Sequence, residues 1–317
     1  MKIYQNKGNT PTKAGFGQGV LEAAKQNPAV LGIGVDITKS VSMDLFTEAF
    51  PDRFISLGVA EQNAVGVSAG LALSGKVPVF ATYAVFSALR TTDFIRVSVC
   101  YNDLHVVIGG AHAGISVGPD GATHQALEDI AIMRSLPRMT VLSPADATQA
   151  RLLTKKAINE LTGPVYVRFG REAVPDFTDR DQSLTIGKGQ LLRPGKDLTI
   201  VATGHMVWEA LEAAGPLSEK GIEARVINMH TIKPLDEDIL MQAARETGLL
   251  VTVEEHQVTG GLGGAVAEVL AEKSPVRLKR IGMKDRFGES GRPEELMEKY
   301  GLTSKQIINE TIKLLKE

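Results

Sequence analysis

The stretch DRFISLGVAEQNAVGVSAGLALSG, residues 52–75, decides the fold of this chain. Its apolar residues between positions 54 and 59 predict a strand. The segment after Glu61 is so rich in alanine, glycine, valine and leucine that it predicts a helix buried on most sides, and Gly75 is the expected helix stop. Glu61 thus stands at the start of a buried helix, directly after a strand. It is either a first-turn acid that interacts favourably with the helix dipole or a proton-handling carboxylate in an apolar pocket.

On both sides of this stretch, apolar runs alternate with helical patterns. Such alternation predicts a parallel sheet covered by helices on both faces, which is a three-layer α/β domain. The further expected strands are 29–35, 77–80, 105–108, 140–142 and 165–169. The further expected helices are 15–26, 87–101, 124–135 (capped by Thr123) and 145–159.

The alternation stops between residues 173 and 186, where the sequence is polar, contains proline and has no period. A second α/β series follows, with expected strands at 198–202, 224–229, 249–254 and 276–281. The chain therefore divides into a predicted first domain at 1–172, a linker at 173–186 and a second domain at 187–317. Residues 1–12 are expected to form a loose arm.

Composition and charge exclude several classes of protein. Of the 317 residues, 43% are apolar and 23% are charged, so two cores can form without disulfides or metals. The net charge is -2, and lysine and arginine are scattered, which argues against nucleic acid or an anionic membrane as a partner. Cys100 is the only cysteine, which excludes internal disulfides and thiolate zinc sites. Without a long apolar stretch or a signal-peptide core, the chain is expected to be soluble and cytoplasmic.

A glycine-dense loop, residues 109–124, follows the expected strand at 105–108 and contains His112, Asp120 and His124. Glycine lets the backbone approach a ligand closely, and polar groups at the end of a parallel strand favour binding or catalysis. The alternative is that these histidines are merely solvated. Their spacing matches no metal site, and the chain has neither a Walker A sequence nor a Gly-x-Gly-x-x-Gly that opens a helix after the first strand.

Polar side chains also follow other expected strands. Asp36 and Ser40 come after the first one, at the sheet edge where ligands bind. Arg171 suits a phosphate or carboxylate clamp, and the alternative is a surface salt bridge. In the second domain, the glycine run 260–264 before a helix predicts either an anion site or close helix packing. Three histidines of that domain are expected at the surface or at an interface: His205, His230 and His256.

Two segments together resemble the transketolase family, specifically its C-terminal half. LGVAEQNAVG, residues 57–66, resembles the strand-Glu-helix signature, and SVGPDGATHQALEDIAIMRSLPRMTVLSPAD, residues 116–146, resembles the second signature. The resemblance implies a pyrimidine-binding domain at 1–172 and a transketolase C-terminal domain at 187–317. The family's diphosphate-binding domain, whose Gly-Asp-Gly and following Asn hold magnesium, has no counterpart here.

The chain is therefore similar to the second subunit of split transketolases. That resemblance implies a partner polypeptide that supplies the diphosphate and Mg²⁺ site, with thiamine diphosphate bound across the interface. It also implies a self-dimer that joins two partner chains to form a heterotetramer. The lone chain is then expected to be inactive, since half of the coenzyme contacts would be absent.

The same resemblance implies roles for individual residues. Glu61 would hydrogen-bond the aminopyrimidine nitrogen of the coenzyme and favour the imino tautomer that removes the thiazolium proton. Tyr83 and Phe86 would pack on the pyrimidine ring, and Asp36 would be a further contact at the cofactor interface. His124 would meet the reacting hydroxyls of the donor ketose, and Asp120 would meet a neighbouring hydroxyl. The expected sugar-phosphate ligands are His112, Arg171, Ser40 and Lys13, the last in place of an arginine in the family.

The chain departs from the family pattern around these residues. Ala60 and Gln62-Asn63 flank Glu61 where the family has Arg or Ile and His, and Leu89 replaces an aromatic. Besides a transketolase subunit, two alternatives stay open. One is another thiamine-dependent enzyme, either half of a deoxyxylulose phosphate synthase or a 2-oxoacid dehydrogenase beta subunit. The other is a non-catalytic regulatory subunit. His112 and His124 favour sugar phosphates over 2-oxoacids, and a retained buried Glu61 favours catalysis.

Overall fold

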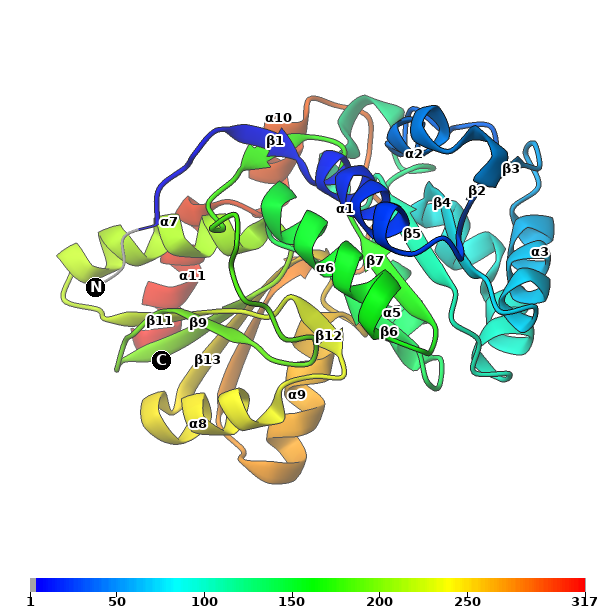
Figure 1. Cartoon of the computed structure of the whole chain (residues 1–317). Coiled ribbons are helices and arrows are strands. Elements are labelled where there is room, and N and C mark those ends of the chain that lie inside the picture. The colour runs from blue at the N-terminus through cyan, green and yellow to red at the C-terminus, as the bar shows by residue number, and fades with distance from the viewer. Residues whose placement is uncertain (1–3, 317) are drawn as a thin grey trace.

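The computed structural model describes residues 4–316, which form two adjoining α/β units (Figure 1). The first unit is built on a seven-stranded sheet with the order β12-β6-β7-β5-β4-β2-β3. Its strands are parallel except for β12, which runs antiparallel to β6. The strands are β2 (Val30–Gly34), β3 (Phe54–Ser56), β4 (Val77–Tyr83), β5 (Val107–Ala111), β6 (Thr140–Leu142), β7 (Val165–Arg168) and β12 (Thr231–Lys233).

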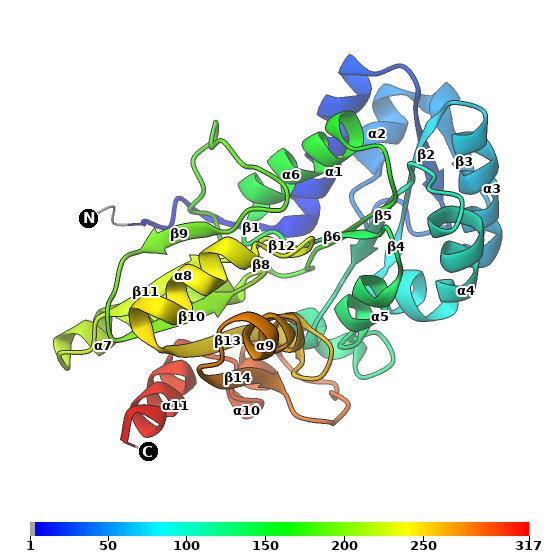
Figure 2. The ribbon, with the colours of Figure 1, turned by 90° about the horizontal axis from the view of Figure 1, so that it is seen from below.

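Helices cover both faces of this sheet, over two separate apolar clusters (Figure 2). Gly15 permits the close contact between α1 and α6, because a Cβ there would lie 1.9 Å from the Ala147 carbonyl oxygen. The first face carries α1 (Thr12–Gln26), α2 (Asp44–Ala49), η1 (Pro51–Arg53) and α6 (Ala147–Glu160). The second face carries α3 (Glu61–Leu73), η2 (Phe86–Arg90), α4 (Thr92–Phe94), η3 (Ile95–Cys100) and α5 (Asp129–Ser135).

The second unit has a five-stranded sheet with the order β14-β13-β10-β11-β9, parallel except for β9. Its helices also lie on both faces, so the predicted class of two three-layer α/β domains is confirmed. The strands are β9 (Gln190–Arg193), β10 (Leu198–Ala202), β11 (Ala224–Asn228), β13 (Leu249–Gln257) and β14 (Arg277–Met283). The helices are α7 (Met206–Glu219), α8 (Glu237–Thr247), α9 (Leu262–Lys273), α10 (Pro293–Lys299) and α11 (Ser304–Lys316).

The two units share one core. Strand β12 belongs to the second half of the chain but extends the first sheet. One apolar cluster includes Ile130 and Met133 of α5 together with Ile227 and Leu262 of the second unit. Helix α10 packs on η4 (Ile115–Asp120), within the glycine-dense loop of the first unit. The second unit therefore supports the loop that carries candidate site residues.

The expectation of a loose N-terminal arm is wrong for the described part of residues 1–12. Residues Asn9–Pro11 form β1, which pairs antiparallel with β8 (Ala173–Pro175) at the start of the expected linker. Helix α1 then begins at Thr12 rather than at Gly15. Short polar strands show no period, so their long-range pairing was not visible in the sequence. Residues 1–3 lie outside the described part.

Other local expectations also need correction. The helix expected at 87–101 is interrupted at Thr91, between η2 and α4. The helix expected at 124–135 begins only at Asp129, and Thr123 contacts His124 instead of capping it. The strand expected at 54–59 ends at Ser56. Helix α3 is buried on one face only, because a Cβ added at Gly66 or Gly70 would have no neighbouring atom within 4 Å. The apolar composition of α3 is thus not explained by contacts among residues 4–316.

None of the helices within residues 4–316 has the length and apolarity needed to cross a membrane.

Candidate functional site

The predicted site residues gather where parallel strands of the first sheet end. Tyr83 is the last residue of β4, and His112 directly follows β5. Asp36 follows β2, and Glu61 opens the helix after β3. Because neighbouring parallel strands end at the same sheet edge, residues distant in sequence meet there. Asp36 and His112 both have positive φ values, of 71° and 55°, a backbone region that non-glycine residues adopt at turns and functional sites.

Glu61 is buried at the N-terminus of α3, as the sequence predicts. Its carboxylate oxygen Oε1 accepts a hydrogen bond of 2.7 Å from Nη1 of Arg90. The guanidinium carbon of Arg90 also lies 4.2 Å from the centroid of the Phe86 ring. Sequence reasoning missed Arg90, since it is 29 residues from Glu61 and no local pattern connects the two. The site thus contains an ion pair beside an aromatic face.

Four rings form the centre of the site. The Tyr83 centroid is 5.9 Å from that of Phe86 and 4.3 Å from that of His112. His124 contacts both aromatic residues edge-on, with centroids 5.9 Å from Tyr83 and 5.5 Å from Phe86. The histidines predicted for sugar binding therefore lie against the aromatic residues predicted for the pyrimidine. A ligand bound on these rings would lie on a flat apolar surface, with the imidazole nitrogens of the protein within reach.

Ser40 and Lys13 complete one side of this cluster. Ser40 Oγ lies 2.9 Å from Tyr83 Oη and 3.5 Å from Nε2 of His112. Lys13 Nζ donates to the Ser40 carbonyl at 3.2 Å. The structure brings these two residues to His112 even though Lys13 lies in α1 and Ser40 follows β2.

His112 is nearly fully buried, and its burial, together with the charges of Lys13 and Arg171, lowers its pKa to about 4. The imidazole is therefore neutral at pH 7. Its Nδ1 is buried and has no hydrogen-bond partner among residues 4–316. A buried nitrogen without a hydrogen-bond partner lowers the stability of the fold unless a ligand or water bonds to it.

Arg171 and Asp120 form an ion pair of 3.0 Å, and Arg171 Nε lies 3.5 Å from Glu172. Arg171 thus forms a salt bridge, as the alternative interpretation holds, and its partner Asp120 is itself a predicted site residue. Asp36 is exposed, and no side-chain bond joins it to the other predicted residues within the described part of the chain. Contacts therefore connect Glu61, through Arg90, with the four rings, Ser40 and Lys13, whereas Asp120 and Arg171 form a separate ion pair and Asp36 stands apart.

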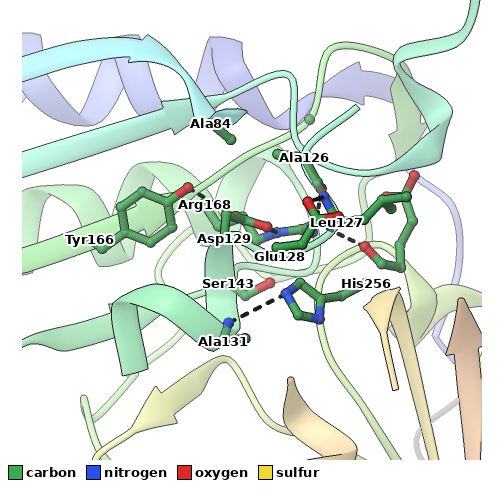
Figure 3. A network of polar contacts seen from close by, with 12 residues as sticks. Ala84, Ala126, Leu127, Glu128, Asp129, Ala131, Ser143, Tyr166, Arg168 and His256 are labelled. Atoms are coloured by element: carbon green, nitrogen blue, oxygen red, sulfur yellow. Dashed lines mark hydrogen bonds and ion pairs between the residues drawn. The ribbon is translucent and has the colours of Figure 1, made fainter. Parts of the chain in front are cut away.

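A buried polar network, unforeseen from the sequence, links this loop to the second unit (Figure 3). Arg168 Nε donates to Asp129 at 2.9 Å, and Arg168 Nη2 donates to the Glu255 carbonyl at 2.8 Å. Tyr166 Oη donates to Asp129 at 2.9 Å. The side chain of Glu255 accepts a 2.6 Å hydrogen bond from the Ser116 amide. A residue of the second unit therefore holds the backbone of the loop that carries His112 and Asp120.

Two of the histidines expected at the surface or at an interface of the second unit are not at the surface. His230 and His256 are both fully buried, and burial lowers the pKa of each to about 4. His256 Nε2 accepts from the Ala131 amide at 3.4 Å, across the boundary between units (Figure 3). Apolar periodicity cannot locate such contacts, because they join distant segments.

The glycine run at 260–264 binds a carboxyl group of the protein itself. Glu254, fully buried, accepts hydrogen bonds from the amides of Leu262 and Gly263 at 2.7 and 2.8 Å. Burial raises the pKa of Glu254 to about 7. The free anion site that the glycine run allowed is therefore filled by a side chain.

One further motif has an ordinary structural explanation. Residues 66–70 read Gly-Val-Ser-Ala-Gly, the spacing of a serine-hydrolase nucleophile motif. That motif requires a sharp turn between strand and helix, but here it lies inside α3. Ser68 Oγ donates to the Ala64 carbonyl at 2.7 Å and is buried, so it is not a nucleophile.

Comparison with known proteins agrees with these observations. The family described as the transketolase pyrimidine binding domain matches residues 9–176, and the transketolase C-terminal domain matches residues 187–307. The 6-deoxy-6-sulfo-D-fructose transketolase subunit SqwH of Clostridium sp. (strain MSTE9) is 42% identical over 91% of this chain and 89% of its own length. The 1-deoxy-D-xylulose-5-phosphate synthase of Desulforudis audaxviator is 40% identical over 95% of this chain, which spans 49% of that enzyme.

A solved structure described as a split gene transketolase, inactive beta4 tetramer, is 45% identical. It superposes with a TM-score of 0.89 over 98% of this chain and 99% of its own. The two matched domains cover most of the chain in the order that both signatures imply. The chain therefore belongs to the thiamine diphosphate-dependent transketolase family, as a relative of the C-terminal subunits of split transketolases.

Proposed function

We propose that this chain is the C-terminal subunit of a transketolase that transfers a two-carbon ketol unit from a ketose phosphate to an aldose phosphate. The observation that carries this proposal is the buried Glu61 carboxylate, joined through Arg90 to the Phe86 ring, with Tyr83, His112 and His124 in the same cluster of rings. A second polypeptide would hold the diphosphate of thiamine diphosphate and its Mg²⁺. Within residues 4–316, no group of three or more metal-ligating side chains could hold the ion.

The residues present fit the pyrimidine half of the coenzyme. That half is a flat ring with nitrogens that hydrogen-bond a carboxylate. The pocket already accommodates a flat N–H donor of its own, because the Arg90 guanidinium contacts both Glu61 and the Phe86 face. Tyr83 extends the aromatic surface, and its hydroxyl is held by Ser40 at 2.9 Å. Asp36, at the same sheet edge, remains a proposed contact on the partner side.

When bound, thiamine diphosphate supplies the carbon nucleophile that carries the two-carbon unit. Glu61 would hold a proton at the pyrimidine ring nitrogen, in a water-poor site where the hydrogen bond is strong. Phe86 and Tyr83 would fix the ring orientation. His112, which is neutral at pH 7, would donate to or accept from the sugar phosphate through its free Nδ1.

The remaining substrate contacts follow from the same geometry. His124 would exchange a proton with the hydroxyl next to the reacting carbonyl, since it lies against both aromatic rings. Asp120 would accept a hydrogen bond from a neighbouring hydroxyl, and its ion pair with Arg171 orients both side chains. The expected ligands of the phosphate are His112, Arg171, Ser40 and Lys13.

The exposed apolar surface of the first unit supports a multi-subunit assembly. Tyr101 is 80% exposed and Leu73 is 72% exposed. Leu73 ends α3 and Tyr101 follows η3, which packs against α3, and α3 also has a bare face at Gly66 and Gly70. Single exposed apolar residues are common, but a contiguous set points to a protein interface. The other large apolar residues exposed on this unit are Val59, Leu89, Phe94 and Val97. The proposed assembly is two copies of this chain with two partner chains.

The test is an activity assay of the assembled complex. This chain is purified with a partner that carries a Gly-Asp-Gly magnesium motif, sought in the neighbouring gene, and ketol transfer is measured with thiamine diphosphate and Mg²⁺. Glu61→Gln should lower turnover by about two to four orders of magnitude, whereas Glu48→Gln on exposed α2 should not. Transfer at the wild-type rate by Glu61→Gln would contradict the proposed role.

A second candidate, half of a deoxyxylulose phosphate synthase, is favoured by the 40% identity over 95% of this chain. It would use pyruvate instead of a ketose phosphate as donor, and so would a 2-oxoacid dehydrogenase beta subunit. Pyruvate turnover by the complex, without ketol transfer, would establish this class. For a non-catalytic subunit, Glu61→Gln would change nothing. Burial of Glu61 alone does not exclude that class, because Arg90 pairs with it.

A further inference from the structure

Arg90 lies inside the candidate site, yet the proposed reaction assigns it no task. Its Nη1 donates to Glu61 Oε1 at 2.7 Å, and its guanidinium lies 4.2 Å from the Phe86 centroid. These are the two contacts that the proposed function assigns to the aminopyrimidine ring: a carboxylate partner and an aromatic face. A guanidinium resembles that ring in being flat and in presenting N–H donors along its edge.

The guanidinium and the coenzyme ring therefore compete for one carboxylate and one ring face. We propose that Arg90 is an internal placeholder, which occupies the pyrimidine half of the coenzyme site in the coenzyme-free chain and must leave when the coenzyme binds. This inference rests on the proposed function and adds a determinant of coenzyme affinity to it. Without the placeholder, the Glu61 carboxylate would be buried with no cation, a costly state.

The exposure of the two partners shows which one moves. The side chain of Glu61 is only 4% exposed, whereas that of Arg90 is 41% exposed. Arg90 is also the last residue of η2, and Thr91 interrupts the helical run with φ and ψ of -112° and 5°. The arginine can thus swing into solvent or towards a partner subunit, while the glutamate stays in place to receive the coenzyme.

The consequence is a lowered affinity for the coenzyme. When a ligand binds only the molecules whose site is open, its apparent dissociation constant is the intrinsic constant divided by the open fraction. Removing the Arg90 cation should open the site and tighten binding. This effect has the opposite sign to bulk electrostatics, because deleting a cation near a site for an anionic diphosphate would otherwise weaken binding.

The experiment measures thiamine diphosphate binding to the assembled complex by isothermal titration calorimetry with Mg²⁺ present. Arg90→Met retains the length and the apolar contact with Phe86 but removes the charge. Its dissociation constant should fall by roughly tenfold, as expected for loss of one charge-assisted hydrogen bond that is partly exposed. Arg96→Met, at an exposed arginine of η3, should leave the constant unchanged. An equal or larger dissociation constant for Arg90→Met would overturn the proposal.

A double-mutant cycle with Glu61 tests the mechanism. In a Glu61→Gln background the competing ion pair is already absent, so Arg90→Met should give no further gain. A full tenfold gain in that background would show that Arg90 does not act through Glu61. Arg90→Gln serves as a second variant if Arg90→Met does not fold. Failure of the wild-type complex to bind the coenzyme would overturn the proposed function as well, whereas equal binding by wild type and Arg90→Met would overturn only the placeholder.

Discussion

At the scale of single residues, burial of His256 between the two units fixes its protonation state. Nδ1 donates to the Gln257 carbonyl at 2.8 Å, and Nε2 accepts from the Ala131 amide at 3.4 Å. A proton on Nε2 would break the second bond, and burial lowers the pKa of this histidine to about 4. An unfolded chain titrates its histidines near the ordinary value of about 6.5.

The pH dependence of stability follows from this difference. Below about pH 6.5 this histidine is protonated in the unfolded chain but stays neutral in the folded chain. The free energy of unfolding therefore falls as the pH decreases towards 4. Between pH 6.5 and pH 5, His256 should lower the free energy of unfolding by about 2 kcal/mol. The measurement is urea unfolding of wild type and His256→Gln at pH 7 and pH 5. A variant that loses as much stability as wild type over this interval would contradict the argument.

Glu254 acts in the opposite direction. Its pKa is raised to about 7 by burial, so folded Glu254 keeps its proton to higher pH than an unfolded glutamate does. Its contribution to stability therefore increases as the pH falls from about 7 towards 4.5. The total pH profile reflects both groups, and only the difference between wild type and His256→Gln isolates the histidine.

At the scale of elements, some glycines are required for close contact between helices and others are not. A Cβ at Gly15 would lie 1.9 Å from the Ala147 carbonyl, whereas one at Gly70 of α3 would meet nothing within 4 Å. Gly15→Ala should force α1 and α6 apart and cost about 1–3 kcal/mol of unfolding free energy. Gly70→Ala should instead stabilise the lone chain by about 0.5–1 kcal/mol, since alanine favours a helix. Urea unfolding of the two variants distinguishes these signs, and a loss of stability in both would contradict the account.

The sequence predicted elements where the signal is local. Apolar runs located the strands around Val30, Val77, Val107 and Val165, because strands buried on both faces are continuously apolar. It could not predict contacts formed between distant segments. The pairing of β1 with β8, the transfer of β12 to the first sheet and the Arg90 ion pair all belong to this class.

The candidate site shows the same division. Glu61, His112 and His124 stood out through motifs and strand ends, and the structure brings them to one sheet edge. The environments of Arg168 and His256 depend on contacts across the boundary between the two units, which no residue pattern near them reveals. The bare face of α3 is a different case, because no contact within residues 4–316 explains its apolar composition.

At the scale of the whole molecule, the second unit acts on the site through Glu255. Its carboxylate holds the Ser116 amide at 2.6 Å, and its carbonyl accepts from Arg168 at 2.8 Å. Ser116 lies in the loop between His112 and Asp120, so we expect Glu255 to position the proposed substrate contacts. The second unit would then act on the proposed site as well as support subunit contacts.

Glu255→Gln removes the charge from that hydrogen bond while keeping its shape. In the assembled complex, the KM for the donor sugar phosphate should increase by roughly tenfold, the effect of one weakened charge-assisted hydrogen bond. The dissociation constant for thiamine diphosphate should stay the same, because Glu61 and Phe86 are untouched. Glu272→Gln, on the exposed end of α9, is the matched control. Equal losses in sugar and coenzyme binding would indicate general unfolding rather than positioning.

The central claim is that Glu61 hydrogen-bonds the pyrimidine ring of a coenzyme that this chain binds together with a second polypeptide. A crystal structure of the assembled complex with thiamine diphosphate and Mg²⁺ tests it most directly. The account predicts a pyrimidine ring nitrogen within about 3 Å of the Glu61 carboxylate, the ring against Phe86, and the Arg90 guanidinium displaced. A ring nitrogen that faces any other side chain, with Arg90 still bonded to Glu61, would contradict it.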